Sequence, residues 1–336
     1  MFTGTLMNKD HPTIKFGKTG ILLINLGTPD STGWWDIRKY LKEFLSDRRV
    51  IEVNPIVWQI ILNLFILTFR PSKTAHAYKK IWRQENNESP LLYFTRSQSK
   101  KLNEKIGGEK ILVDFAMRYG NPSINSKLIN LKNEGCENII VLPLYPQYAA
   151  ATTATVCDEV YRTLMKMRWQ PSLQIIPHYE SEPLYIDALV RSIKDKLKNI
   201  DWKPDLIISS YHGIPKSYFD KGDPYHCYCQ KTTRLIKEKF NEIEIKTTFQ
   251  SRFGPQEWLT PYTDKTMESL PKQGVNNLLV ICPGFSSDCV ETLEEINIQG
   301  RESFLNNGGK NFDLIPCLND NPDHIELFEK LVAKYL

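Results

Sequence analysis

Residues 282–299 read CPGFSSDCVETLEEINIQ, and the organisation of the chain can be worked out from this stretch. An apolar run precedes it, LLVIC at 278–282, whose length and composition predict a buried strand. A Pro-Gly pair then ends the strand, and the polar residues that follow can cap a helix: Ser286, Ser287 or Asp288. The stretch therefore predicts a strand that hands over to a helix, as in an α/β fold.

Three carboxylates stand out in the predicted helix. Asp288, Glu291 and Glu295 are three and four residues apart, a spacing that would place all of them on one helix face. Like charges at this spacing repel each other, and the first basic residue downstream is Arg301. The row indicates handling of cations or protons, although a solvated helix face is the alternative and Asp288 can serve as an N-cap alone.

The alternation of short apolar runs and helical stretches continues along most of the chain. It predicts an α/β fold built of βαβ units, with parallel sheets covered by helices on both faces. Strands are expected at 21–26, 111–117, 138–144, 173–177, 205–210, 244–249, 278–282 and 313–317. The helices include 94–106, 122–134, 182–199, 229–241 and 320–335.

The chain also contains an internal duplication. NLGTP at 25–29 matches YHGIP at 211–215, and FAMRYG at 115–120 matches FQSRFG at 249–254. NIIVLP at 138–143 and NLLVICP at 277–283 form a third pair. We therefore expect two similar Rossmann-like domains, 18–175 and 176–310, with an inserted apolar lip around 33–70 in the first. A closing strand and helix, 311–336, would pack back across both domains.

The repeated motifs fall at the carboxyl ends of predicted strands. Open α/β sheets bind ligands at this edge, so two such halves predict a cleft between them. Neither GxGxxG nor GxxxxGK[ST] occurs at these strand ends, which counts against dinucleotide and nucleotide cofactors.

His212 is the strongest single candidate at this edge, because Gly213 and Pro215 form a rigid turn directly after its strand. Taken alone, a histidine is more often a hydrogen-bonded structural residue. The carboxylates after the equivalent strand of the same half favour a functional role. These ligands are too few for a closed structural metal site, and they suit transient metal handling or proton transfer.

Other candidates come from the remaining strand ends. Arg118 and Tyr119 offer a guanidinium and an aromatic face for an anionic substrate, although such an arginine can also bind carbonyls or a carboxylate of the protein. Three aromatic residues can line a flat hydrophobic slot or simply pack in the core: Tyr145, Trp258 and Phe285.

The segment 56–69, IVWQIILNLFILTF, is strongly apolar but shorter than the roughly 20 residues that span a bilayer. We therefore do not expect it to cross a membrane. It forms either a buried helix or an apolar lip that can touch a membrane. The lip residues would be Ile56, Trp58, Ile60, Leu64 and Phe65.

Composition narrows the class of protein. The 43 basic and 39 acidic residues give a net charge of +4, which makes no case for nucleic-acid binding. Seven cysteines at irregular spacing, several of them in apolar runs, fit reduced core thiols in a reducing compartment. The N-terminal residues lack the apolar core of a signal peptide, so we expect a cytoplasmic protein with at most peripheral contact to the inner face of the membrane.

Eight motifs, in order, resemble those of the ferrochelatase family over residues 18–335. They are LLINLGTPD (22–30), SPLLYFT (89–95), MRYGNP (117–122), LPLYPQY (142–148), SYHGIP (210–215), KGDPY (221–225), SRFGPQEWL (251–259) and CPGFSSDCVETLEEI (282–296). The resemblance implies two Rossmann-like domains with a porphyrin cleft between them. It also implies insertion of Fe²⁺ into protoporphyrin IX, the last step of haem synthesis, with release of two protons.

The resemblance also assigns residues. The family's histidine and glutamate at the iron site match His212 and Glu291. Arg118, Tyr119, Tyr145, Trp258 and Phe285 match the porphyrin cleft. Asp288 and Glu295 match an acidic path for protons or metal, and residues 56–69 match the lip at the cleft mouth.

The chain departs from the family pattern at three places, and each departure leads to a prediction. Some members have a second histidine where this chain has Cys289, which puts a two-histidine proton relay in doubt. Asn297 and Gln299 indicate a shorter acidic path. The chain ends soon after Cys317, so we expect no iron–sulfur cluster and no resident cofactor, with Fe²⁺ as a substrate.

Several alternatives remain at this point. The physiological porphyrin can be coproporphyrin III, although the apolar lip favours the less carboxylated protoporphyrin. A Co²⁺ or Ni²⁺ chelatase acting on a more carboxylated tetrapyrrole would need basic residues at the lip. A non-enzymatic haem- or metal-binding protein is the third alternative. The sequence does not determine the oligomeric state, for which a monomer is the simplest expectation.

Overall fold

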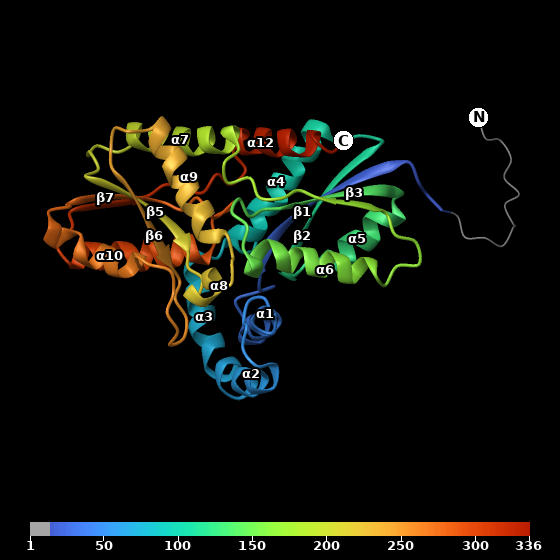
Figure 1. Ribbon diagram of the computed structural model, residues 1–336, viewed down its shortest axis with the longest axis horizontal. Helices are drawn as coiled ribbons and strands as arrows, with labels where there is room; N and C mark the ends of the chain where they lie inside the picture. The colour runs from blue at the N-terminus through green and yellow to red at the C-terminus, as the bar shows by residue number, and fades with distance from the viewer. Residues whose placement is uncertain (1–13) are drawn as a thin grey trace, which may run out of the picture.

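The computed structural model describes residues 14–336 and contains two separate four-stranded sheets whose strands are all parallel (Figure 1). The first has the order β2-β1-β3-β4, with β1 (Lys18–Thr28), β2 (Ile111–Gly120), β3 (Cys136–Pro143) and β4 (Ser172–Ile175). The second has the order β6-β5-β7-β8, with β5 (Leu206–His212), β6 (Ile245–Gln250), β7 (Asn277–Ile281) and β8 (Asn311–Leu314). The α/β class is confirmed, and each predicted strand overlaps an observed one. The last strand, expected at 313–317 as part of a closing unit, runs instead over 311–314 and is the outer strand of the second sheet.

The two sheets repeat one topology. In each, the first strand along the chain pairs with the second on one side and the third on the other, and the fourth lies outermost. The first strands carry the matching NLGTP and YHGIP motifs at their ends, so the duplication seen in the sequence corresponds to two similar halves.

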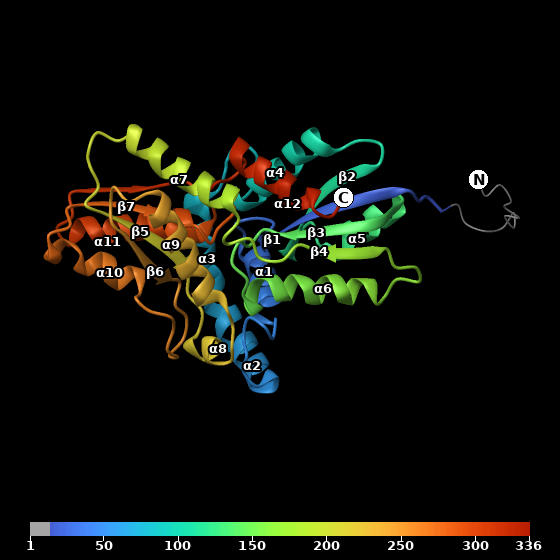
Figure 2. The ribbon, with the colours of Figure 1, turned by 45° about the horizontal axis from the view of Figure 1, so that its top comes forward.

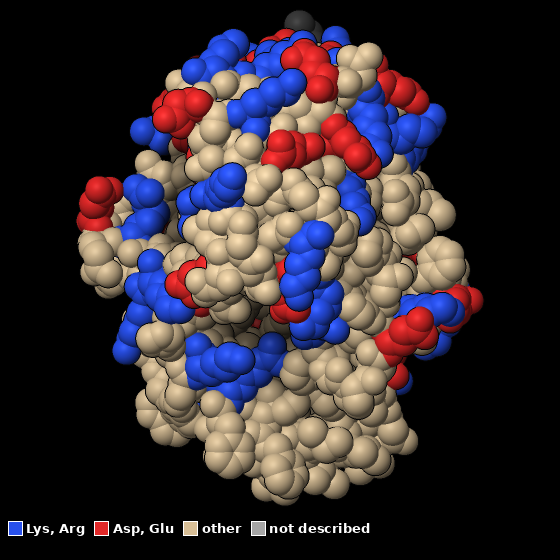
Figure 3. Space-filling view, turned by 90° about the vertical axis from the view of Figure 1, so that its left-hand side faces the viewer, with Lys and Arg blue, Asp and Glu red and all other residues tan. Residues whose placement is uncertain are grey.

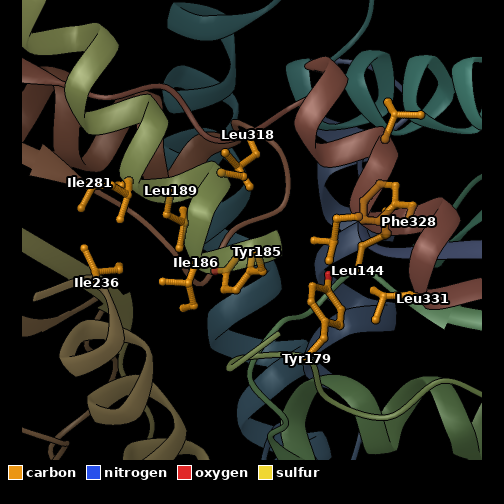
Figure 4. Close-up of a cluster of buried hydrophobic side chains, with 14 of the residues drawn as sticks. Leu144, Tyr179, Tyr185, Ile186, Leu189, Ile236, Ile281, Leu318, Phe328 and Leu331 are labelled. Atoms are coloured by element: carbon orange, nitrogen blue, oxygen red, sulfur yellow. The ribbon is translucent and has the colours of Figure 1, made fainter. Parts of the chain in front are cut away.

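Helices cover both faces of each sheet, as the buried apolar runs of the strands require. The face shared by the two halves is covered by α4 (Pro90–Ile106), α7 (Pro183–Lys198), α9 (Tyr225–Lys239) and α12 (Pro322–Ala333), which enclose one continuous apolar cluster (Figures 2 and 4). The opposite face is covered by α5 (Ile124–Asn133) and α6 (Thr155–Leu164) in the first half, and by α10 (Thr263–Ser269) and α11 (Arg301–Asn306) in the second.

The C-terminal helix joins the two halves. From α12, Glu329 pairs with Lys105 of α4 at 2.6 Å, and Asp323 pairs with Arg191 of α7 at 2.7 Å. Phe328 and Leu331 of the same helix enter the cluster that also contains Tyr185 of α7 (Figure 4). The halves are therefore held by helix packing, since no strand pairing connects the two sheets in the described residues.

The lip, residues 33–70, projects away from the sheets (Figure 1). It comprises α1 (Trp34–Leu45) and the start of a continuous helix formed by α2 (Pro55–Ile61), the π-helical turn η1 (Leu62–Ile66) and α3 (Leu67–Ile81). Shorter helical segments complete the described chain: η2 (Ala150–Ala154), α8 (Lys216–Asp220), η3 (Pro271–Gln273) and the π-helix η4 (Glu291–Gly300).

Within residues 14–336, the continuous helix Pro55–Ile81 is long and apolar enough to cross a membrane by length and composition alone. The segment 56–69, expected to be too short to span a membrane, is only the first half of this helix. The second half is packed against the protein, because Ala75 and Tyr78 are buried and Lys80 Nζ binds Glu294 at 3.0 Å. The part before Arg70 alone reaches about 22 Å, against about 30 Å for a hydrocarbon core.

Candidate active site

His212 is the last residue of β5 and lies opposite Gln250, the last residue of β6. The next amide, that of Gly213, donates to the Gln250 carbonyl at 2.7 Å. A Cβ at Gly213 would lie 2.9 Å from this carbonyl oxygen and 3.2 Å from the Trp258 ring, so the close approach requires glycine. The turn thus fixes the half-buried His212 at the sheet edge.

A single hydrogen bond determines which ring nitrogen of His212 is free. Its Nδ1 lies 2.6 Å from the Gly213 carbonyl oxygen. A carbonyl oxygen only accepts hydrogen bonds, so the proton of the neutral ring is on Nδ1 and the lone pair is on Nε2. His212 therefore presents a base, or a metal ligand, at Nε2.

Glu291 begins η4, and its backbone is tied to the same strand end. Gln250 Nε2 donates to the Glu291 carbonyl at 2.9 Å, while Ser210 Oγ donates to Gln250 Oε1 at 2.7 Å. Gln250 thus holds His212 through its backbone and Glu291 through its side chain. The sequence analysis missed this residue, because a neutral amide carries no chemical signature of its own.

Glu295 lies one turn further along η4 and is close to both candidate catalytic residues. Ser251 donates to its two carboxylate oxygens, from the backbone amide at 2.8 Å and from Oγ at 2.5 Å. Burial raises the pKa of Glu295, and the neighbouring Glu291 raises it further, whereas Ser251 and His212 oppose the rise. His212, Glu291 and Glu295 therefore form one electrostatically connected group.

Asp288 is not part of this group, and the expectation of three carboxylates on one helix face is wrong. Asp288 precedes the helix, and its carboxylate accepts from Thr292 Oγ1 at 3.1 Å, the Cys317 amide at 3.2 Å and Asn319 Nδ2 at 2.7 Å. These contacts direct it toward the end of β8, whereas Glu295 bonds beyond β6, at the opposite edge of the sheet. The helix itself is a π-helix, a form that is frequent at functional sites.

Arg118 and Tyr119 lie in the first half, at the end of β2. Arg118 Nε donates to the Thr155 carbonyl at 2.8 Å, and its guanidinium forms an ion pair with Asp47 of the lip. The Tyr119 hydroxyl donates to the same carboxylate at 3.0 Å. Arg118 is buried and its charge is already neutralised by the ion pair with Asp47.

The aromatic candidates differ in exposure. Tyr145 is buried, its pKa is raised by burial, and its hydroxyl has no partner among the described residues. Trp258 is buried over Gly213 and donates from Nε1 to the Phe253 carbonyl at 2.9 Å. Phe285 is partly buried where the halves meet, beside Cys289 of the second half and Leu91 and Met117 of the first.

A small cavity separates Glu291 from the first half. It is lined on one side by Tyr40, Tyr78 and Ser89 and on the other by Cys289 and Glu291. Its volume is about 10 Å³, room for about one water molecule. A flat macrocycle needs several hundred Å³, so the walls must move apart to admit one at this point.

The lip exposes most of its apolar side chains. Ile56, Ile60, Leu64 and Phe65 are all exposed, which excludes the alternative of a buried helix. Trp58 is the exception among the predicted lip residues, because it is buried and donates from Nε1 to the Leu45 carbonyl at 2.6 Å. Figure 3 shows this end of the molecule almost free of charged side chains, with Lys and Arg around a hollow above it.

Ferrochelatases are among the known proteins to which this chain is similar. A family model described as ferrochelatase matches residues 18–336. The ferrochelatase of Rhizobium meliloti (strain 1021) is 54% identical over 332 residues, covering 98% of each chain. That of Agrobacterium fabrum is 52% identical over 330 residues, covering 97% of this chain and 96% of the relative.

Among solved structures, the fold is similar to that of SirB from Bacillus subtilis with Fe³⁺. The TM-score is 0.58, and the match covers 94% of this chain and 95% of that one. At 12% identity, this likeness concerns the fold alone.

Proposed function

Because this chain belongs to the ferrochelatase family, whose members catalyse the last step of haem biosynthesis, we propose that it inserts Fe²⁺ into protoporphyrin IX and that His212 and Glu291 carry the insertion. The observation that carries the assignment is the placement of His212, with its lone pair on Nε2, and Glu291 at one strand end, where Gln250 ties them together.

Insertion exchanges two protons for one metal ion. The two pyrrole N–H bonds break, four nitrogens bind Fe²⁺, and no electron is transferred. Nε2 of His212 can accept a pyrrole proton or bind Fe²⁺ for a moment, since imidazole is both a base near neutral pH and a ligand for iron. Glu291 takes the other role, as the acceptor of the second proton or as the ligand of the metal.

Glu295 extends the site away from the cleft. Its raised pKa makes it a better proton acceptor than an ordinary carboxylate, and its carboxylate accepts hydrogen bonds from Ser251. We assign the proton or metal path to Glu291 and Glu295. The contacts of Asp288 give it a supporting role in place of the path role expected from the sequence.

The porphyrin is proposed to lie between the two halves. Phe285 and Trp258 would contribute the second-half wall, while Arg118, Tyr119 and Tyr145 would support the first-half wall from behind. Binding energy from such walls can bend a macrocycle, which turns a nitrogen lone pair toward the metal.

No resident cofactor is assigned, and Fe²⁺ is treated as a substrate. Five of the seven cysteines are buried, and burial raises the pKa of each of their thiols: Cys136, Cys229, Cys282, Cys289 and Cys317.

The lip bears on the choice of substrate. Its exposed apolar side chains suit the less carboxylated protoporphyrin better than coproporphyrin III or the substrates of Co²⁺ and Ni²⁺ chelatases. The same surface is proposed to make peripheral contact with a membrane, from which an apolar porphyrin could be drawn.

An anaerobic insertion assay tests the function. Wild-type protein should convert protoporphyrin IX and Fe²⁺ or Zn²⁺ to the metalloporphyrin faster than coproporphyrin III. His212→Ala should lose roughly 100-fold or more in kcat, the usual contribution of a general base. The control is His226→Ala, since His226 stacks on Phe249 with the ring centroids 5.6 Å apart and should retain activity. Full activity of His212→Ala would overturn the residue assignment, and tight haem binding without insertion would overturn the function.

A further inference from the structure

Gln98 is a fully buried side chain of α4 that crosses from the first half to the second. Its Nε2 lies 2.8 Å from the Asn319 carbonyl oxygen and 3.2 Å from that of Ser286. The hydroxyls of Ser286 and Ser287 lie 3.3 and 3.1 Å away. One amide group of the first half therefore touches both the segment before η4 and the loop after β8.

The orientation of this amide is fixed by its partners. Two carbonyl oxygens face Nε2 and can only accept hydrogen bonds, so a flipped amide would place oxygen against oxygen. The donor group of Gln98 is thus required where it lies.

Asn319 receives this contact and passes it on. Its backbone has φ of +47°, a left-handed conformation that asparagine tolerates. Its amide donates to the Ser286 carbonyl at 3.1 Å, and its carbonyl accepts from both Gln98 and His324. Its side chain pairs with Asp288 twice, accepting from the Asp288 amide at 2.8 Å and donating to Oδ2 at 2.7 Å.

Asp288 completes the connection to the site. It lies three residues before Glu291, and its Oδ1 accepts from Thr292 Oγ1, which holds the first turn of η4. Gln98 Oε1 is buried without a hydrogen-bond partner among the described residues, so this side chain is held through its Nε2 alone. A shift of Gln98, Asn319 or Asp288 would break these buried hydrogen bonds and leave further polar groups unpaired, which resists displacement. The chain of contacts runs from α4 through Asn319 and Asp288 to Thr292, the residue after Glu291.

Gln250 holds the Glu291 backbone within the second half, but the position of Glu291 relative to the first half depends on contacts between the halves, such as those of Gln98 and the Lys80–Glu294 pair. The described strands form no ladder between the two sheets, and Glu291 faces Tyr40 and Tyr78 of the first half across a cavity of about 10 Å³. A displacement of about 1 Å at such a site can cost roughly 100-fold in rate.

We propose that Gln98 is a positioning residue, which, through Asn319 and Asp288, fixes Glu291 against the first half of the cleft. This inference rests on the proposed role of Glu291 in metal insertion.

The test is Gln98→Met, which keeps the volume and removes the donor, with Gln147→Met as the matched control. Gln147 is also a buried amide joining the halves, but its Nε2 binds Thr232 of α9 at 3.0 Å, and it has no hydrogen bond to residues 286–288. We expect Gln98→Met to lower kcat for Zn²⁺ insertion by at least about tenfold, with the KM for porphyrin within about threefold of wild type.

Two further measurements separate positioning from general loosening. Amide hydrogen exchange across 286–295 should be faster in Gln98→Met than in Gln147→Met when each variant is measured at the same interval below its own Tm. Gln98→Glu, which is isosteric but faces two carbonyl oxygens, should be at least as impaired as Gln98→Met. An active Gln98→Glu, equal kcat losses in the two methionine variants, or unchanged exchange at 286–295 would each overturn the proposal. Because wild type is assayed alongside, failure of the proposed function would appear separately, as absence of insertion in wild type.

Discussion

The exposed lip gives the most quantitative prediction. Ile60, Leu64 and Phe65 are 54%, 63% and 59% exposed, so more than half of each side chain can still be removed from water. Fully burying such a side chain contributes about 1.5–3 kcal/mol. The remaining burial of the three in a bilayer is therefore worth about 3–5 kcal/mol, or about two to three and a half powers of ten in a partition coefficient.

The assay is co-sedimentation of the protein with liposomes of phosphatidylcholine and phosphatidylglycerol. We expect replacement of all three lip residues by serine to lower the partition coefficient by about 100-fold or more, with Tm changed little because the exposed faces pack against nothing. The apolar contribution of the lip to vesicle binding should persist at high salt, since salt screens only interactions between charges.

The matched control is the triple serine variant of Tyr161, Met165 and Trp169, which are 52%, 80% and 40% exposed and lie outside the lip. It removes a similar amount of exposed apolar surface and should bind vesicles as wild type does. Vesicle binding by the lip variant at wild-type strength would refute the reasoning. An equal loss in both variants would also refute it, because the effect would then follow total hydrophobicity.

Two further predictions concern stability. The pKa of Glu295 is raised from its ordinary value near 4.5, so the native protein binds the carboxyl proton more tightly than the unfolded chain does. This tighter proton binding stabilises the native state at low pH, and the stabilisation is lost as pH rises through the raised pKa. Glu295→Gln should therefore gain Tm relative to wild type as pH increases from about 4 to 7, and parallel Tm profiles would contradict the burial argument. Trp58→Ala should destabilise the protein by about 3–5 kcal/mol, and Trp58→Phe by less, in denaturant unfolding. Equal effects of the two Trp58 variants would exclude a packing role.

The strands were predictable because their signal is local. Runs such as ILLINL and LLVIC are apolar and rich in β-branched residues over the length of a buried strand, and the same strand order recurs in the second half. The carboxyl-end rule then pointed to His212 and to the carboxylates after the 278–282 strand, while the choice of Glu291 among them came from the family resemblance.

The lip shows where this reasoning ends. Nearly every residue of 56–69 is apolar, so no periodicity indicates which face is buried. In the structure Trp58 and Leu62 are buried at a spacing of four, and the next buried residue, Leu67, follows after five. The π-helical turn η1 makes this longer step, since its hydrogen bonds reach from i to i+5. A single turn of this kind shifts the phase of the helix, and composition carries no trace of it.

The same limit explains the error at Asp288. Three carboxylates at helical spacing were given one role, but their partners lie at positions 251 and 317–319, on opposite edges of the sheet. Partners so distant in sequence are fixed by topology alone. Gln98 and Gln250 went unnoticed for a related reason, because an amide performs no chemistry and acts only by where it donates. His212 and the carboxylates could be named as candidates from the sequence, whereas the neutral residues that hold them in place required the fold.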